Sequence, residues 1–349
     1  MKSRSFARAA QQVSAVDRVA ESAAEERQLR LTKPAGSLGD LELIGNRLAS
    51  ISGRCPPQIP RQAVVCLFAA DHGVVASGVT PWPQSVTAAM VENIALGGAG
   101  INAIADTVGA EILLVDIGVV GDLSSLDAVH HAKVSDGTKN LAVEAAMSAS
   151  DATAALDVGV GVADAAIDGG ADLVVTGEMG IGNTTASAAL IAALAPASPR
   201  EVTGRGSGID DDHYVRKADI VAAAVDRCRG FSPEQVLAEV GGLEIAALAG
   251  LIVGAASRRV PVLVDGVICC AALLVAERLV PGVVDYCFAG HRAVEPGAHV
   301  VHEELSLRPV LDLNLRLGEG SGACLAVPVV QCAAAALGEM ATFDEAGIG

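Results

Sequence analysis

Short apolar runs alternate with stretches of helical pattern through most of this chain. Four runs are rich in Val, Leu and Ile, which is typical of buried strands; they lie at 63–69, 111–116, 172–176 and 261–265. Helical patterns lie between them at 85–96, 151–168, 185–193 and 211–228. Strands that alternate with helices indicate a parallel sheet with helices on both faces. The pattern therefore predicts an α/β fold.

The two ends of the chain have a different pattern from the middle. Residues 8–30 are polar and rich in Ala and Glu, which predicts a helix; the segment 33–39 (KPAGSLG) then interrupts the pattern before a second helix from about Asp40. Another break at 55–60 (CPPQIP) precedes the first strand run. A long apolar helix is predicted to begin near Ala323.

Each predicted strand ends in a polar or Gly-rich segment. These segments are 71–73 (DHG), 116–118 (DIG), 177–183 (GEMGIGN) and 265–266 (DG). In open α/β sheets, ligands bind outside the carboxyl ends of the strands. We therefore expect these segments to share one crevice.

Composition and charge narrow the classes of function. The chain has 349 residues, 51% of them hydrophobic but only 2% aromatic, so its core must be built from Ala, Val, Leu and Ile. The formal net charge of −17 disfavours nucleic-acid or membrane-surface partners. A small anionic ligand stays compatible with this charge, because backbone amides and one Lys can bind it locally.

Cysteine usage and hydropathy indicate a cytoplasmic protein. The eight cysteines form no Cys-x-x-Cys pair and several lie in apolar runs, which favours buried thiols in a reducing compartment. The basic first residues are not followed by an apolar signal core. The apolar runs at 243–256 and 323–337 are too short or interrupted to cross a bilayer. We expect no membrane partner.

Two Gly-rich turns precede helices and are candidate phosphate sites. The first, 177–185 (GEMGIGNTT), follows a strand, where free backbone N–H groups and the helix dipole favour phosphate; it lacks the Gly-x-Gly-x-x-Gly spacing and a Walker Lys. The second, 204–208 (GRGSG), is followed by Lys217 one to two turns inside the next helix. Ordinary tight turns remain the alternative for each.

One carboxylate stands among glycines near the C-terminal helix. In 318–322 (GEGSG), Glu319 has a sterically open backbone on both sides. The apolar helix that follows argues for a partly buried carboxyl with a raised pKa, which suits proton transfer. A solvated loop Glu is the alternative, and His72 is either a base or a structural histidine.

Three side chains with a spacing of four raise the question of a metal site. They are His291, Glu295 and His299. On one continuous helix this spacing would indicate a metal-binding face, but Pro296-Gly297 interrupts it and Pro favours the first turn of a new helix. We expect no metal.

Eight segments together resemble one family, the nicotinate-nucleotide:dimethylbenzimidazole phosphoribosyltransferases. In chain order the motifs are 33–39 (KPAGSLG), 69–74 (AADHGV), 80–87 (TPWPQSVT), 176–185 (TGEMGIGNTT), 204–208 (GRGSG), 261–266 (PVLVDG), 289–292 (AGHR) and 313–322 (LNLRLGEGSG). The resemblance runs from about residue 30 to the end. Each motif is weak alone, but eight in family order are highly specific.

The resemblance implies a fold, an activity and partners. It implies a large Rossmann-like domain at 61–322 and a small helical domain built from both chain ends, 1–60 and 323–349. It also implies a homodimer that needs no metal and no redox cofactor. The implied reaction converts nicotinate mononucleotide and 5,6-dimethylbenzimidazole to alpha-ribazole 5′-phosphate and nicotinate, in assembly of the cobalamin nucleotide loop.

The resemblance also implies site residues. The general base falls on Glu319 and a second carboxylate on Glu178. The groups implied to bind phosphate and ribose are Gly180, Gly182, Asn183, Thr184, Gly206 and Lys217. Gln84 is the candidate for the pocket that holds the benzimidazole.

Two other functions remain open from the sequence. A nicotinamide-dependent oxidoreductase should show Gly-x-Gly-x-x-Gly after the first strand, and residues 70–73 (ADHG) do not match it. A catalytically silent nucleotide sensor would have similar binding loops. The base used in the cell, whether dimethylbenzimidazole, adenine, a phenol or another benzimidazole, is not readable from the residues.

Overall fold

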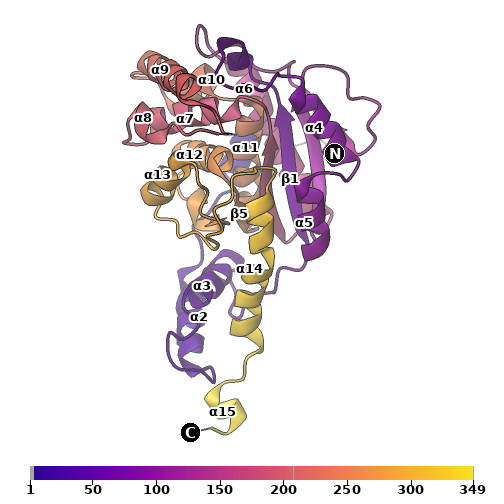
Figure 1. Cartoon of the computed structure of the whole chain (residues 1–349). Coiled ribbons are helices and arrows are strands. Elements are labelled where there is room, and N and C mark those ends of the chain that lie inside the picture. Colours follow the sequence, from indigo (N-terminus) through magenta and orange to yellow (C-terminus); the bar gives the residue numbers. More distant parts are fainter. Residues whose placement is uncertain (1–3, 207, 349) are drawn as a thin grey trace.

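A computed structural model describes residues 4–206 and 208–348 of the chain, and one parallel sheet lies at its centre (Figure 1). The strand order is β3-β2-β1-β4-β5-β6, and every pair of neighbours is parallel. The strands are β1 (Ala63–Ala70), β2 (Glu111–Gly118), β3 (Val129–His131), β4 (Leu173–Met179), β5 (Val262–Val264) and β6 (Cys287–Ala289).

The four apolar runs are strands of this sheet, so the predicted parallel α/β sheet is confirmed. All eight residues of β1 are buried, as expected for a strand covered on both faces. The edge strands β3 and β6 were not predicted, because a strand of three residues is too short to show a pattern.

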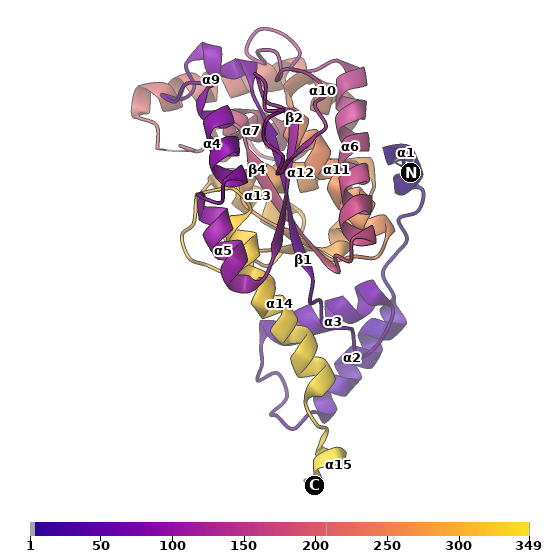
Figure 2. The same cartoon turned by 90° about the vertical axis from the view of Figure 1, so that its right-hand side faces the viewer.

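Helices cover both faces of the sheet (Figure 2). On one face α11 packs against β1, β2 and β4 and is itself covered by α6; on the other, α4, α5 and α14 contact the strands. The longer helices are α2 (Arg18–Arg30), α3 (Asp40–Ser52), α4 (Val86–Ala95), α5 (Gly100–Val108), α6 (Ala149–Asp168), α7 (Asn183–Leu194), α9 (Asp211–Arg227), α10 (Pro233–Val240), α11 (Leu243–Ser257), α12 (Val267–Leu279), α13 (Pro296–Glu304) and α14 (Ser321–Glu339). Shorter ones are α1 (Phe6–Ala10), η1 (Gly73–Ser77), α8 (Pro199–Val202), η2 (Val283–Tyr286) and α15 (Phe343–Ala346).

The prediction of one helix over residues 8–30 was wrong. The structure has two helices there, α1 and α2, separated by residues 11–17. The side chain of Asp17 accepts hydrogen bonds from the backbone N–H groups of Val19 and Ala20, which starts α2 at Arg18. An N-cap inside an Ala-rich segment therefore divides what looked like continuous helix.

Below the sheet, α2 and α3 pack against the C-terminal part of α14 (Figure 1), whereas α1 packs against α6 and α11 on the main body. A second apolar cluster lies there, formed by Ala24, Leu31, Ala49 and Leu337. α14 is continuous from Ser321. Buried residues of its first half, such as Val327, belong to the main core. The division into domains at 60/61 and 322/323 stays a prediction, with residues 1–3 and 349 outside the described residues.

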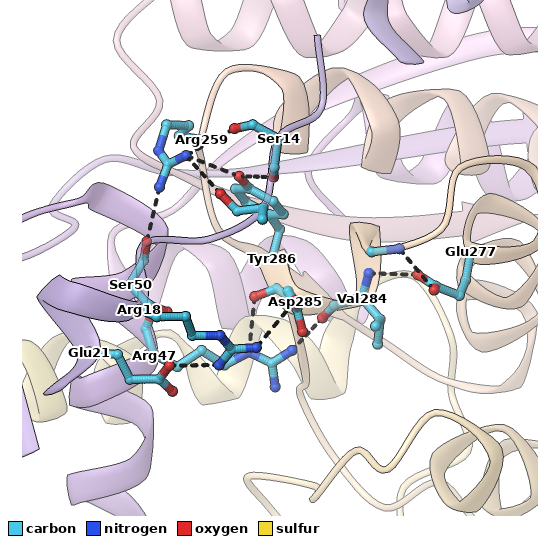
Figure 3. A network of polar contacts seen from close by, with 12 residues as sticks. Ser14, Arg18, Glu21, Arg47, Ser50, Arg259, Glu277, Val284, Asp285 and Tyr286 are labelled. Carbon is cyan, nitrogen blue, oxygen red and sulfur yellow. Dashed lines mark hydrogen bonds and ion pairs between the residues drawn. The ribbon is translucent and has the colours of Figure 1, made fainter. Parts of the chain in front are cut away.

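A polar network joins the N-terminal segment to the rest of the protein (Figure 3). The guanidinium of Arg259 donates to the carbonyl oxygens of Ser50 and Ile51, at 3.0 and 2.9 Å. The hydroxyl of Tyr286 donates to the carbonyl oxygen of Ser14 at 2.8 Å. The guanidinium of Arg47 donates to carbonyl oxygens of η2. These bonds hold the segment before α2 and the helix α3 against the end of the sheet.

Two helical segments among the described residues are long and apolar enough to cross a membrane, Val86–Val108 and Ser321–Glu339. The first consists of two helices, α4 and α5, with residues 96–99 between them. More than half of the apolar stretch in the second is buried inside the protein. This is weak evidence for a membrane span, because a core helix of a globular protein passes the same test.

Candidate active site

The strand order reverses beside β1, which is where an open α/β sheet is expected to bind a ligand. The chain leaves β1 toward β2 on one side, while β4 pairs with β1 on the other. At the ends of these strands, a Cβ on Gly180 would lie 2.4 Å from the carbonyl oxygen of Ala70, so only glycine permits this approach. The hydroxyl oxygen of Thr87 accepts the N–H of Ile181 at 3.1 Å, which attaches α4 to the turn after β4.

A cavity of about 160 Å³ opens after the carboxyl ends of β4 and β5. Its lining includes most of the residues that the sequence analysis named, Glu178, Gly180, Gly182, Asn183, Thr184, Gly206 and Lys217. Glu319 is not in the lining, although its neighbours Leu317 and Gly318 are. Gln84 is not in the lining either; it is half-buried in the loop between Thr80, which does line the cavity, and α4.

The first Gly-rich turn places the start of α7 at this cavity. Gly182 is the N-cap of α7 and has a φ of +97°, a conformation that favours glycine. The first residues of α7, Asn183 and Thr184, both line the cavity. A helix N-terminus presents unpaired backbone N–H groups and the positive end of the helix dipole, which together bind anions.

Lys217 supplies a buried positive charge next to this helix N-terminus. It lies on α9, and only 2% of its surface is exposed. The ammonium nitrogen donates to the hydroxyl of Thr184 at 3.0 Å and to the carbonyl oxygen of Gly204 at 3.1 Å. Burial lowers the pKa of Lys217 to about 8. An anion bound here would replace the lost hydration of the ammonium.

The segment around Glu319 forms a turn of unusual backbone conformation. Gly318, Glu319 and Gly320 all have positive φ, at +85°, +62° and +80°. A Cβ on Gly320 would lie 2.9 Å from the carbonyl oxygen of Thr176, so the turn packs closely on β4. A non-glycine residue at positive φ costs about 1 kcal/mol, and such strain clusters at functional sites. The fold holds Glu319 in this conformation between two glycines.

The Glu319 carboxylate is buried and has one backbone donor. Its Oε2 accepts the N–H of Ile101 in the first turn of α5, at 3.1 Å. Burial raises the pKa of Glu319, the Ile101 bond opposes the rise, and the charge of Asp265 adds to it. The pKa of Glu319 is thus raised by its surroundings, and its carboxyl lies at the start of α5 while its neighbour Gly318 lines the cavity.

Glu178 is a second buried carboxyl, and its pKa is also raised. Burial, followed by the charges of Asp265 and Glu244, raises the pKa of Glu178 to about 8. The side-chain amide of Asn183 donates to its Oε2, and a Cβ on Gly318 would lie 2.5 Å from its Oε1. At pH 7 Glu178 is therefore mainly a neutral acid that lines the cavity.

Sequence reasoning missed two pairs of buried ionisable residues near the cavity. Nε2 of His72 lies 2.7 Å from Oε1 of Glu244, and both side chains are fully buried. Nε2 of His291 lies 3.3 Å from Oδ1 of Asp265, which also accepts the N–H of Ala323 at the start of α14. His291 lines the cavity. The sequence analysis had named the segments 71–73, 265–266 and 289–292. It could not predict the pairs, because a single sequence does not show which side chains meet across the sheet.

The residues His291, Glu295 and His299 do not lie on one helix. α13 begins at Pro296, with Glu295 as its N-cap, so the predicted interruption is confirmed. Glu295 instead turns to the second Gly-rich segment, where its Oε1 accepts the N–H of Gly206 at 2.8 Å. Ser207 in that segment lies outside the described residues.

Beyond the geometry of the site, the chain as a whole matches a known family. A family model described as phosphoribosyltransferase, DBI_PRT, matches residues 13–348. The chain belongs to this family. A nicotinate-nucleotide–dimethylbenzimidazole phosphoribosyltransferase from Salinispora tropica is 49% identical, over 96% of this chain and 97% of that protein. One of the same name from Mycobacterium tuberculosis is 49% identical, over 96% and 93%.

Solved structures of the family have the same fold. The crystal structure of CobT from Thermus thermophilus superimposes with a TM-score of 0.92 at 45% identity, covering 95% of this chain and 99% of that chain. The resemblance in the eight sequence motifs and the Rossmann-like fold class are thereby confirmed.

Proposed function

We propose that this phosphoribosyltransferase moves the ribose phosphate of nicotinate mononucleotide onto 5,6-dimethylbenzimidazole, forming alpha-ribazole 5′-phosphate and nicotinate. The observation that carries this proposal is the family match over residues 13–348, with relatives of that name at 49% identity over nearly the whole chain. The cavity at the strand ends agrees with it, because its lining includes the groups that can bind an anion and also Gly318, the neighbour of Glu319.

The phosphate of the nucleotide binds at the α7 end of the cavity. Gly182 and the first turn of α7, the hydroxyl of Thr184 and the ammonium of Lys217 line this end, and the N–H of Asn183 already donates to the carbonyl oxygen of Gly180 at 3.2 Å. An ammonium at a helix N-terminus attracts a phosphate dianion without a metal ion being required. Gly180 and Gly206 leave room for the ribose phosphate to approach the backbone.

The transfer itself exchanges one bond at the anomeric carbon for another. The unprotonated ring nitrogen of dimethylbenzimidazole donates its electron pair to this carbon, and the bond to the pyridinium nitrogen breaks. The electron pair of that bond neutralises the nicotinate ring, so the leaving group needs no proton. The other ring N–H of the benzimidazole becomes acidic, and one carboxylate base removes its proton.

Glu319 is the base in this proposal. A raised pKa makes its carboxylate a better proton acceptor, and its backbone conformation fixes it behind Gly318. Glu178 is protonated at neutral pH and is therefore assigned to positioning and electrostatic support. Gln84 is assigned to the benzimidazole pocket, on its place beside Thr80 and α4.

The setting of the enzyme is also part of the proposal. We assign it to the cytoplasm as a homodimer, with residues 61–322 as the catalytic domain and the two chain ends as a small helical domain. The net charge of −17 and the buried thiols support a cytoplasmic enzyme that does not bind nucleic acid or membranes. The second apolar cluster between α2, α3 and α14 supports the small domain.

One assay separates this function from the two alternatives. The protein is mixed with nicotinate mononucleotide and dimethylbenzimidazole, and both free nicotinate and alpha-ribazole 5′-phosphate are quantified by chromatography. We expect the two products in equal amounts. Nucleotide binding without products would identify a sensor, and a reaction that required a nicotinamide dinucleotide would identify an oxidoreductase.

A further inference from the structure

A carboxylate lies within the phosphate end of the cavity, where repulsion of the substrate would be expected. Glu295 lines the cavity together with Gly206 and Lys217, and its Oε1 accepts the N–H of Gly206 at 2.8 Å. It is the N-cap residue of α13, so the helix fixes its backbone. The mechanism above gives this side chain no role.

Glu295 and Lys217 hold the same turn through different atoms. Glu295 binds the N–H of Gly206, while the ammonium of Lys217 donates to the carbonyl oxygen of Gly204 at 3.1 Å. A Cβ on Gly204 would lie 1.9 Å from Oε2 of Glu295 and 2.7 Å from its Oε1. The carboxylate therefore lies directly against this turn, and only glycine at position 204 permits the contact.

We propose that Glu295 is a positioning residue for the phosphate anchor: it holds the turn at 204–206 in place and, through its charge, keeps Lys217 in the ammonium form that binds phosphate. This inference rests on the proposed function. It explains why an acidic group is present in an anion site, because a neutral amine at Lys217 would attract phosphate far less than an ammonium does.

The electrostatics of the cluster agree with this geometry. Burial lowers the pKa of Lys217 to about 8, and the charge of Glu295 opposes this decrease. α7 carries no ionisable residue. Several other charged side chains on packed elements pair elsewhere or are exposed: Arg205 with Asp211, Asp210 with His213, Glu239 with Arg227, and exposed Arg200, Glu201, Asp212, Arg216, Asp219, Glu234 and Arg316. Two further ionisable groups line the same cavity: His291, which pairs with Asp265, and Glu178, whose pKa is also about 8. The variants in the Lys217→Met background below separate the titration of Glu178 from that of Lys217.

The test compares Glu295→Gln with the wild-type enzyme across pH. Glutamine retains an oxygen that accepts the Gly206 N–H but removes the charge, so the pKa of Lys217 should fall further. In the wild type, kcat/KM for nicotinate mononucleotide decreases as pH rises through the pKa of Lys217, because the ammonium is lost. In Glu295→Gln we expect this decrease at lower pH, with kcat/KM within about threefold of wild type at pH 6.5 and lower by about tenfold at pH 8.5.

Three further variants separate charge from structure. Glu303→Gln, an exposed site on the same helix, should keep the wild-type profile. Glu295→Asp keeps the charge and should keep the pH of the decrease, even if shorter reach lowers kcat/KM at every pH. In a Lys217→Met background, Glu295→Gln should no longer change the pH dependence.

Two outcomes would overturn the inference. One is an unchanged pH profile in Glu295→Gln, which would leave Glu295 as a helix cap only. The other is a lower KM for the nucleotide at every pH, which would show that Glu295 repels the phosphate. If the wild type forms no products, the proposed function fails; calorimetric titration of nicotinate mononucleotide and of inorganic phosphate at both pH values still tests the role of Glu295.

Discussion

The two sides of the cavity show the same physical effect with opposite sign. On the phosphate side, burial lowers the pKa of Lys217 to about 8; on the carboxylate side, burial raises the pKa of Glu178 to about 8. Desolvation disfavours the charged form of each group. On the phosphate side, a bound anion would favour the charged form of Lys217. On the carboxylate side, Glu178 is mainly neutral at pH 7, and the pKa of Glu319 is raised above its ordinary value. Burial thus adjusts both sides for work near neutral pH.

The largest effect is expected where the chemistry needs a proton acceptor. Glu319→Gln keeps the size of the side chain and its acceptor for the Ile101 N–H but cannot remove a proton. We expect kcat to fall by about 10²–10⁴ while nucleotide affinity changes little. Steady-state kinetics measure this, with exposed Glu234→Gln as the control. A decrease of less than about threefold would move the base role to Glu178, His72 or solvent.

A substitution on the phosphate side should change the KM for the nucleotide and not kcat. Lys217→Met removes the buried charge and is expected to raise the KM for nicotinate mononucleotide about tenfold or more, or about 1.4 kcal/mol. Exposed Lys139→Met should leave it unchanged. An unchanged KM in Lys217→Met would show that the helix N-terminus alone binds the phosphate.

The stability of this variant tests the sign of the pKa shift. The folded-state pKa of Lys217 lies below its ordinary value of 10.5, so wild-type stability is lost as pH falls through about 8. In ligand-free protein, the Tm of Lys217→Met relative to wild type should therefore rise as pH decreases from 9 to 7. A constant difference across this range would indicate that Lys217 is not desolvated.

An intermediate effect is expected at the glycine between the two carboxyls. In Gly318→Ala the new Cβ would lie 2.5 Å from Oε1 of Glu178, at a φ of +85°. We expect kcat/KM to fall about tenfold. Gly97→Ala is the matched control, because Gly97 has a φ of +81° with no atom within 4 Å of the Cβ position. Both variants should lose roughly 1 kcal/mol of stability, but only Gly318→Ala should lose activity. If the two variants have equal activity, the active site does not lie beside Gly318.

The smallest effect on activity is expected at Glu178. Glutamine imitates the protonated carboxyl, so kcat of Glu178→Gln at pH 6.5 should stay within about threefold of wild type. Because the folded-state pKa lies above the ordinary 4.5, wild-type stability is lost as pH rises toward about 8. The Tm of Glu178→Gln relative to wild type should therefore increase between pH 5 and pH 8. A large loss of kcat at pH 6.5 would make Glu178 the base.

Much of this site was predictable because it follows strand ends. The pattern of buried strands and Gly-rich turns predicted that 71–73, 116–118, 177–183 and 265–266 would share one crevice. The cavity is lined by residues of 177–183 and by Gly266, but by none of 71–73 or 116–118. Turn residues such as Gly182 can be recognised in a sequence, because their backbone conformation favours glycine over other residues. Glu295 was noticed only as part of a broken metal spacing, because its partner Gly206 is 89 residues away.

By itself, the sequence determined the order of the strands along the chain, the glycine turns and the family, because these depend on local patterns and on motifs in a fixed order. Only the tertiary structure decided which neighbours shift the pKa of each buried carboxyl. Glu178 and Glu319 look alike as residues, and their pKa values differ through burial and through neighbours such as Asp265 and Ile101. Desolvation depends on everything packed around a group, and segments far apart in the chain supply that packing.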